Sequence, residues 1–158
     1  MIYLYTDGAA KGNPGPGGYG VLLKKGNLKK ELSSGYRKTT NNRMELLAVI
    51  IGLEALKKIG QKVLVVSDSK YVVDSVEKGW VLNWEKSGFK KKKNIDLWIR
   101  FLSVYRKHVV SFRWVKGHSN HPENERCDFL AVKAAESSTL EIDRGFEDVN
   151  IKKDLFNQ

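Results

Sequence analysis

Two apolar segments that each end in an aspartate constrain the fold of this chain most strongly. Residues 2–6 are mainly aliphatic and aromatic and precede Asp7, and residues 62–67 hold a continuous apolar run that precedes Asp68. Such runs are typical of buried strands, the second of parallel strands covered on both faces. A charged carboxylate beside a core strand is costly unless it is paired or bound to a cation. Taken singly, Asp7 could open an Asp-Gly turn and Asp68 could cap a helix, so two interpretations stay open.

The segments around these runs predict three more strands and five helices. A connection rich in Gly and Pro at residues 12–18 leads to strands at 19–25 and 28–38, which the turn Gly26-Asn27 joins. The connection is not a phosphate-binding P-loop, because a strand rather than a helix follows it. Apolar spacing, caps and breakers predict the other elements. These are helices at 44–59, 70–77, 80–86, 95–105 and from 122 onward, and a fifth strand at 109–115.

This order predicts an α/β fold with a five-stranded mixed sheet and helices on both faces. Three antiparallel strands come first, and right-handed crossovers place the first, fourth and fifth strands side by side and parallel. Ligands of such sheets gather at the carboxyl ends of parallel strands. We therefore expect Asp7, Glu45, Asp68 and Asp128 to meet there, although Glu45 alone could simply favour the positive end of its helix.

The four acids predict a site for hard divalent cations. Uncompensated carboxylates would repel one another and raise their pKa values. Oxygen ligands without His or Cys select Mg²⁺, with Mn²⁺ as a substitute, and two such ions about 4 Å apart support phosphoryl displacement. His118, His121 and Cys127 match no standard zinc spacing. Cys127 is expected to be a small core residue and not a nucleophile.

A basic segment at residues 78–93 indicates a polyanionic partner. It holds six lysines and one acid, and the 158-residue chain has a formal net charge of +10. Trp80, Trp84 and Phe89 lie among the lysines, a combination that favours nucleic acid over a membrane surface. The longest apolar run is too short to span a bilayer, no signal peptide is apparent, and a single cysteine excludes an internal disulfide. We expect one domain, a cytoplasmic location and no membrane contact.

Six sequence blocks resemble bacterial type 1 ribonuclease H, in the order that the family has them, over about residues 1–135. The blocks are YTDG at 5–8, GNPGPGGYG at 12–20, TTNNRMEL at 39–46, SDS at 67–69, WVKGH at 114–118 and HPENERCD at 121–128. The resemblance implies a ribonuclease H-like fold and a magnesium-dependent endonuclease. Such an enzyme cuts the RNA strand of an RNA/DNA hybrid and leaves a 5′-phosphate and a 3′-hydroxyl.

The resemblance also assigns roles to individual residues. It places Asp7, Glu45, Asp68 and Asp128 at the metal-binding carboxylates and His118 at a mobile-loop histidine. It implies contacts with hybrid 2′-hydroxyls or minor-groove edges, a pocket for a DNA phosphate, and a basic protrusion at 78–93. The implied substrate-binding residues are Gly8, Asn13, Asn41 and Asn42, then Lys38, Thr40 and Asn94 of the phosphate pocket, and Lys70, Trp80, Lys90, Lys91, Lys92 and Lys93.

The chain departs from the family's pattern in two places. Lys70 stands where bacterial relatives commonly have glutamine, so a base-edge contact could become a phosphate contact. Residues 138–158 have no match, and we expect them to be a loosely held extension of a catalytic domain at 1–137.

Two alternative functions remain open. A DNA nuclease of the same fold is disfavoured by the asparagine set and the basic segment. A non-catalytic hybrid-binding module would gain nothing from clustered acids. In either case we expect a monomer with no obligate protein partner.

Overall fold

A five-stranded mixed sheet forms the centre of the protein. The computed structural model describes residues 1–149 of the chain. The strands are β1 (Ile2–Ala10), β2 (Gly15–Lys25), β3 (Leu28–Thr39), β4 (Lys62–Ser67) and β5 (Val109–Trp114), in the spatial order β3-β2-β1-β4-β5. β1 pairs antiparallel with β2 and parallel with β4, and β4 pairs parallel with β5. The predicted sheet, with three antiparallel strands followed by parallel ones, is confirmed.

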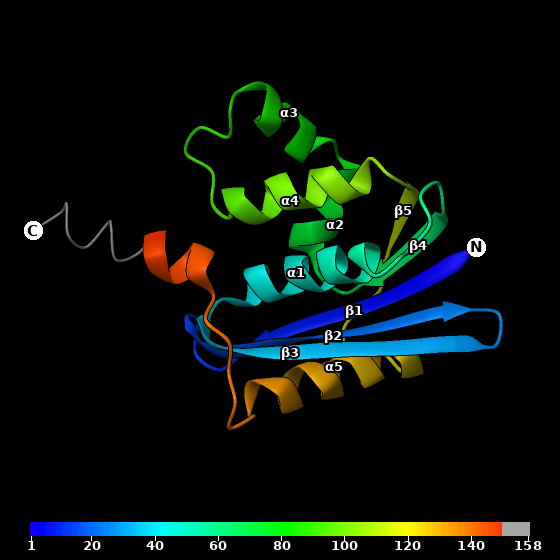
Figure 1. Ribbon diagram of the computed structural model, residues 1–158, viewed down its shortest axis with the longest axis horizontal. Coiled ribbons are helices and arrows are strands. Elements are labelled where there is room, and N and C mark those ends of the chain that lie inside the picture. Colours follow the sequence, from blue (N-terminus) through cyan, green and yellow to red (C-terminus); the bar gives the residue numbers. More distant parts are fainter. Residues whose placement is uncertain (150–158) are drawn as a thin grey trace, which may run out of the picture.

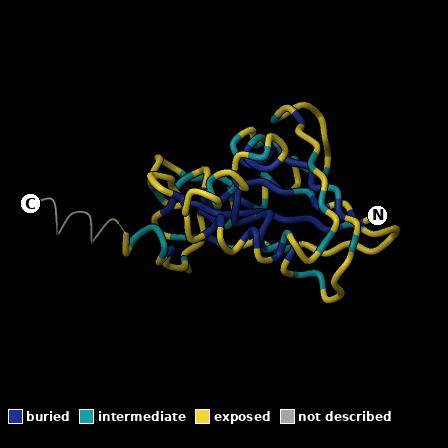
Figure 2. Tube along the Cα trace, turned by 90° about the horizontal axis from the view of Figure 1, so that it is seen from above, coloured by how far each residue is buried: buried dark blue, intermediate teal, exposed yellow. Residues whose placement is uncertain are grey.

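Helices cover both faces of this sheet, as the order of elements predicted. They are α1 (Asn41–Glu54), α2 (Lys70–Glu77), α3 (Trp80–Lys86), α4 (Ile95–Tyr105) and α5 (Pro122–Ala135). Figure 1 shows α5 alone on one face and the other helices on the opposite side. Buried residues run through the middle of the trace in Figure 2, and Leu4, Ile50, Val65 and Trp98 are fully enclosed there. None of the helices described is long and apolar enough to cross a bilayer.

Several predicted boundaries are wrong. β1 continues beyond Asp7 to Ala10, and α1 begins at Asn41 and not at residue 44. β2 begins at Gly15 and not at residue 19, so part of the Gly- and Pro-rich connection is strand. Its glycines allow close packing: a Cβ at Gly18 or Gly20 would lie less than 3.0 Å from backbone oxygens of α5. α1 ends at Glu54 and not at residue 59, although no breaker precedes Gly60. The chain turns there to enter β4, and the Gly60 N–H donates to the Lys107 carbonyl at 2.7 Å.

The segment after α5 returns to the sheet. Its Glu141 forms a parallel bridge with Tyr36 of β3, and residues 144–149 are helical. The Arg37 N–H donates to the Glu141 carbonyl at 2.9 Å, and the Glu141 N–H donates to the Gly35 carbonyl at 2.8 Å. The remaining residues of the expected C-terminal extension, 150–158, lie outside the described residues.

Candidate active site

Three of the four predicted acids meet at one point. Asp7 lies in β1, Glu45 in the second turn of α1, and Asp68 directly after β4. Each offers one carboxylate oxygen, and these oxygens all lie within 4.8 Å of one another. Gly8 permits this arrangement, because a Cβ there would lie less than 3.0 Å from the backbone of Glu45. The carboxyl ends of β1 and β4 and the start of α1 thus converge.

Burial sets the protonation of this cluster. Asp7 is 8% exposed, and burial raises its pKa to about 7, helped by the nearby charges of Asp68 and Asp128 and opposed by hydrogen bonding. Burial and the charge of Asp7 hold the pKa of Glu45 well above its ordinary value. Burial likewise raises the pKa of Asp68. Among residues 1–149 no Lys or Arg forms an ion pair with these carboxyls, so their charges are unfavourable in the metal-free state.

The donor set fits a bound divalent cation. Glu45 Oε2 is buried without a hydrogen-bond partner among the described residues, and such an oxygen is available as a ligand. All the converging atoms are carboxylate oxygens, which Mg²⁺ and Mn²⁺ prefer. Within residues 1–149 this is the one group of three or more His, Cys, Asp or Glu side chains close enough to share an ion.

Asp128 lies beside the three acids without joining them. It comes from the second turn of α5 and lines a pocket together with Asp7, Asp68 and His118. Its oxygens are not among those that meet within 4.8 Å. Its charge nevertheless helps to raise the pKa of Asp7 and of Asp68. The structure therefore places the fourth acid at the wall of the same pocket.

His118 and Cys127 lie in different environments. His118 has a left-handed backbone conformation, with φ of 56°, in the loop between β5 and α5, and it lines the pocket together with Asp7, Asp68 and Asp128. Cys127 is fully buried, its thiol lies 3.2 Å from the Tyr5 carbonyl oxygen, and burial raises its pKa. A buried thiol with a raised pKa is neither a nucleophile nor a metal ligand, so its interpretation as a core residue is confirmed.

The predicted asparagines connect two elements beside the acids. Asn13 Oδ1 accepts a hydrogen bond from the Asn41 N–H at 3.1 Å, and Asn41 Oδ1 accepts one from the Ala10 N–H at 2.7 Å. Thr40 caps α1 through its side chain, which accepts from the Arg43 N–H. The loop after β1 is thereby fastened to the start of α1, and Asn42 is exposed next to it.

Two aromatic residues that sequence reasoning missed support other predicted contacts. Trp114 is 42% exposed, its indole N–H donates to the Asp68 carbonyl at 3.0 Å, and Lys70 Nζ lies 4.8 Å from its ring centroid. The Tyr71 hydroxyl accepts a hydrogen bond from Asn94 Nδ2 at 3.0 Å. Their signals in the sequence were weak. Tyr71 is a single aromatic residue after Lys70, and Trp114 is a single aromatic residue at the start of the block that ends at His118.

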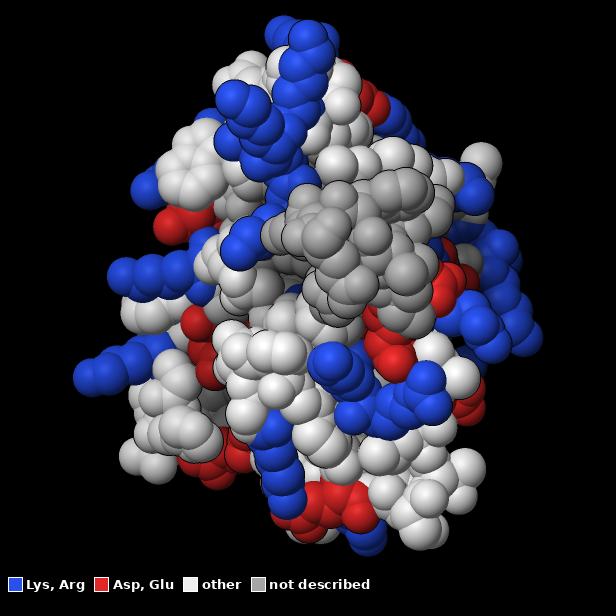
Figure 3. All heavy atoms as spheres, turned by 90° about the vertical axis from the view of Figure 1, so that its left-hand side faces the viewer, with Lys and Arg blue, Asp and Glu red and all other residues white. Residues whose placement is uncertain are grey.

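The basic segment forms a protruding corner of the molecule. Figure 3 shows Lys and Arg side chains gathered at the top of its view, where Figure 1 places α3 and the loop that follows it. Lys90 to Lys93 are exposed, and Trp80 is 42% exposed with Lys78 Nζ 5.3 Å from its ring centroid. Phe89 differs from the expectation, because it is buried in the core and is not available to stack on a ligand.

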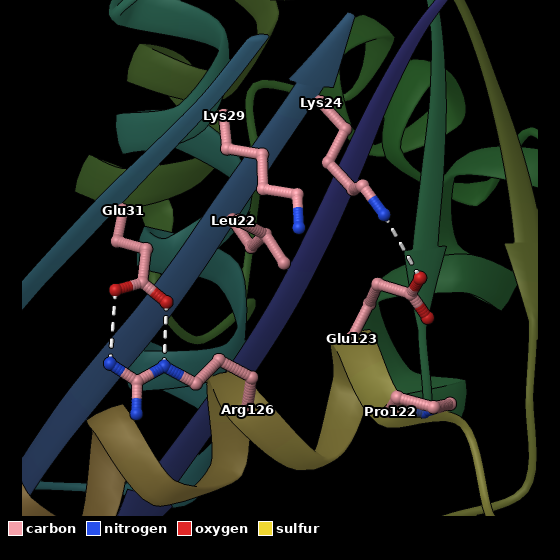
Figure 4. Close-up of a pocket in the computed structure, with 7 residues that line it drawn as sticks. All are labelled: Leu22, Lys24, Lys29, Glu31, Pro122, Glu123 and Arg126. Atoms are coloured by element: carbon pink, nitrogen blue, oxygen red, sulfur yellow. Dashed lines mark hydrogen bonds and ion pairs between the residues drawn. The ribbon is translucent and has the colours of Figure 1, made fainter. Parts of the chain in front are cut away.

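A wider groove lies across the first turn of α5 from the acids. It has a volume of about 630 Å³, and Figure 4 shows its lining side chains. Arg126 forms a bidentate pair with Glu31, at 2.6 and 3.0 Å, and Lys24 pairs with Glu123 at 3.1 Å. Most of its charges neutralise each other, so the groove lacks the concentration of acids found in the pocket beside it.

Comparison with known proteins identifies the family of this chain. The family model for RNase H matches residues 1–136. The chain belongs to the ribonuclease H family. A ribonuclease H from Desulforamulus reducens is 54% identical over 147 residues, which cover 90% of this chain and 92% of that protein. A ribonuclease H from Trichodesmium erythraeum is 52% identical over 151 residues, covering 92% of this chain and 96% of that protein.

Solved structures of ribonucleases H share the fold. LC9-RNase H1, a type 1 RNase H with the type 2 active-site motif, superposes with a TM-score of 0.77 at 34% identity, covering 87% of this chain and 73% of that one. LC11-RNase H1, in complex with an RNA/DNA hybrid, superposes with a TM-score of 0.64 at 28% identity, covering 86% and 97%. The recognition of a ribonuclease H from six sequence blocks is confirmed.

Proposed function

We propose that this ribonuclease H is an endonuclease that hydrolyses the RNA strand of RNA/DNA hybrids and leaves 5′-phosphate and 3′-hydroxyl ends. In this proposal Asp7, Glu45, Asp68 and Asp128 hold two Mg²⁺ ions, with Mn²⁺ as a substitute. The observation that carries it is the convergence of three carboxylate oxygens within 4.8 Å at the carboxyl ends of β1 and β4. When bound, the ions supply activation of the attacking water and stabilisation of the leaving 3′ oxygen.

The residues of the chain have separate tasks in this reaction. The buried cluster holds its carboxylates on the ends of rigid strands and a helix, so the site is organised before substrate arrives. His118 lines the same pocket as Asp7, Asp68 and Asp128, and it assists proton transfer or product departure. The chain needs no side-chain nucleophile for this chemistry.

Polar residues around the acids bind and select the hybrid. Asn13, Asn41 and Asn42, with the backbone at Gly8, contact 2′-hydroxyls or minor-groove edges, which distinguish RNA from DNA. The phosphate pocket is formed by Lys38, Thr40 and Asn94, and Lys70 adds a phosphate contact beside Asp68. Trp80 and Lys90 to Lys93 hold the DNA strand away from the scissile bond. We place the catalytic domain at 1–137, with the protrusion at 78–93 and an extension at 138–158, in a cytoplasmic monomer.

A cleavage assay tests the proposed function. End-labelled RNA/DNA hybrid, duplex DNA and duplex RNA of one sequence are incubated with the protein, with and without Mg²⁺. We expect cleavage of the hybrid's RNA strand alone, and only with the metal. Comparable cleavage of duplex DNA would favour the DNA nuclease. Hybrid binding with no cleavage in Mg²⁺ or Mn²⁺ would favour the binding module.

A further inference from the structure

A second cluster of buried charges lies away from the acids. Arg43 of α1 is 3% exposed and points between Asp96 of α4 and Asp143 of the segment after α5. Its Nε lies 2.8 Å from Asp143 Oδ2, and its Nη2 lies 2.7 Å from Asp96 Oδ2. Asp143 is also buried, so neither Arg43 nor Asp143 is solvated by bulk water. Removing one partner of a buried ion pair leaves an uncompensated charge in the interior and strongly destabilises the fold. Arg43 and Asp143 therefore depend on each other.

The guanidinium of Arg43 also reaches a residue of the proposed phosphate pocket. Its Nη1 lies 3.4 Å from Asn94 Oδ1, in addition to its contact with Asp96 Oδ1 at 2.9 Å. Asn94 precedes α4 with a left-handed backbone, with φ of 62°, and its side chain makes no capping bond to that helix. Its Nδ2 donates instead to the Tyr71 hydroxyl. Arg43 and Tyr71 therefore hold the two ends of the Asn94 amide.

Asp143 contacts the other side of the same pocket. Its Oδ2 accepts from the Thr39 hydroxyl at 2.7 Å, between the pocket residues Lys38 and Thr40. The end of β3, the start of α1 and the start of α4 thus all contact Asp143 directly or through Arg43. A single side chain from the segment after α5 links the elements that carry the pocket.

The segment that carries Asp143 is fastened independently. Glu141 bridges to β3, and Glu147 forms a bidentate pair with Arg37 at 2.9 and 3.0 Å. Figure 1 shows this segment, orange to red, running from the end of α5 past β3 toward the start of α1. The Arg37–Glu147 pair lies on the surface, whereas Asp143 is enclosed. One segment therefore carries a buried link through Asp143 and a surface link through Glu147, whose carboxylate also interacts electrostatically with Lys38.

We propose that Asp143 is a positioning residue, which acts through Arg43 to hold Asn94 in the orientation that binds a DNA phosphate. The proposal rests on the proposed function, because it takes the Asn94 contact from there. Residues 140–149 then act as a strap that sets the affinity for the hybrid, although they touch neither the acids nor the scissile bond.

The test measures steady-state cleavage of a hybrid by the full chain in Mg²⁺. Asp143→Asn keeps the shape of the side chain and removes its charge, so Arg43 is left with one charged partner and Asn94 is no longer held in a fixed orientation. We expect KM to rise roughly 3- to 10-fold and kcat to stay within about twofold. The slope of log affinity against log salt should change little, because that slope counts the contacts of Lys and Arg with phosphates and Asn94 is neutral. Asp148→Asn, which removes an exposed charge from the same segment, is the matched control and should leave KM and kcat unchanged.

A double-mutant cycle separates positioning from mere stabilisation. Asn94→Ala should raise KM, and Asp143→Asn should add nothing to the KM of Asn94→Ala, because both remove the same contact. If the two effects multiply, or if Asp143→Asn lowers only the melting temperature, the positioning role is wrong. If Asp143→Asn does not fold, the cycle is run with Thr39→Val, which removes one hydrogen bond to Asp143 and should show the same non-additivity.

The same experiment distinguishes failure of this inference from failure of the proposed function. Absence of hybrid cleavage by the unmodified chain would overturn the proposed function itself. Normal cleavage with an unchanged KM for Asn94→Ala would remove the phosphate contact and the positioning role of Asp143 together, and would leave the catalytic assignment intact.

Discussion

Asp7 and Glu45 hold protons that an exposed carboxyl would release, because burial raises both pKa values. The pKa of Asp7 is about 7 in the folded protein and near 3.8 in an ordinary setting, so between these values the folded state binds more protons than the unfolded state. The free energy of unfolding then falls as pH rises through this window. For the metal-free protein we expect the melting temperature to be at least about 2–4 °C higher at pH 5 than at pH 8 from this source.

The control for this pH dependence is Asp7→Asn, which cannot titrate at this position. Thermal unfolding of both proteins in a chelating agent, across pH 5 to 8, makes the comparison. An equal dependence on pH in the two proteins would show that Asp7 does not cause it. Saturating Mg²⁺ should flatten the dependence in the unmodified protein, because a bound cation favours the charged carboxylates.

Removing one charge from the cluster should abolish hydrolysis. Asp7→Asn or Asp68→Asn takes away a metal ligand and little volume, and a loss of several kcal/mol of transition-state stabilisation lowers kcat by more than about 100-fold. Hybrid binding should persist, and the metal-free melting temperature should rise as repulsion is relieved. The matched control is Glu125→Gln, an exposed acid at the same pocket. Near-normal activity of either Asp variant in Mg²⁺ would contradict the metal assignment.

His118 should affect turnover and not metal affinity. It lies in the pocket wall, outside the group of oxygens that could share an ion. His118→Ala should lower kcat by about 10- to 100-fold, at the low end of what a general acid or base contributes. The Mg²⁺ concentration for half-maximal activity should stay constant, and His121→Ala provides the control in the same loop. A large increase in that Mg²⁺ concentration would make His118 a ligand.

For single residues, the sequence predicted which acids come together. It did not predict the residues that hold the neighbouring side chains in place. Asp7 and Asp68 follow recognisable apolar runs, and these runs pair in parallel up to Tyr5 and Val66, so the two carboxyls come out side by side. Arg43, Tyr71 and Asp143 make their contacts across 23 to 104 positions of sequence. No local pattern encodes such pairs, because their partners come together only after folding.

Among the elements, α3 and the loop after it should contribute affinity without specificity. Lys90 to Lys93 are exposed, and phosphate contacts position a duplex without reading its bases. Replacement of these four lysines by alanine should raise KM more than it lowers kcat, equally for every hybrid sequence. For each phosphate contact that the replacement removes, the salt slope should flatten by roughly 0.7 to 0.9.

Lys57→Ala/Lys58→Ala is the control for this loop, since these lysines are exposed on a different part of the surface. The control should change neither KM nor the salt slope. An unchanged KM and salt slope in the quadruple variant at low ionic strength would mean that the four lysines are only a solvated surface, and that the DNA strand lies elsewhere.

Element boundaries were predictable where a local signal marks them. The bounds of α2, α3 and α4 are those predicted, since Ser69 caps α2 and glycine or asparagine precedes the other two helices. The end of α1 was missed because no breaker stands next to Glu54. The glycine taken as the stop signal, Gly60, lies further on, where its N–H donates to the Lys107 carbonyl. Phe89 was wrongly expected to be available for contact with nucleic acid. The lysines around it in the sequence give no sign that its side chain is buried.

For the whole molecule, strand order and helix placement followed from the handedness of crossovers, and the five-stranded sheet is as predicted. The return of the segment after α5 was not predictable. Its residues show no periodicity, and they are held by ion pairs and by a single bridge to β3. A chain segment without pattern can therefore complete a fold through a few long-range polar contacts.

The glycines of β2 and β3 have a consequence for the acids. Gly20 lies opposite Asp7 in the sheet, and a Cβ on Gly20 would lie less than 3.0 Å from the carbonyl of Cys127, the residue before Asp128. Gly18 and Gly35 meet α5 at the same close range. The absence of side chains at these glycines therefore sets the distance between α5 and the sheet, and with it the position of the Asp128 carboxylate. We expect Gly20→Ala to push α5 away from the sheet and so to displace the Asp128 carboxylate, although the added methyl group does not contact Asp128.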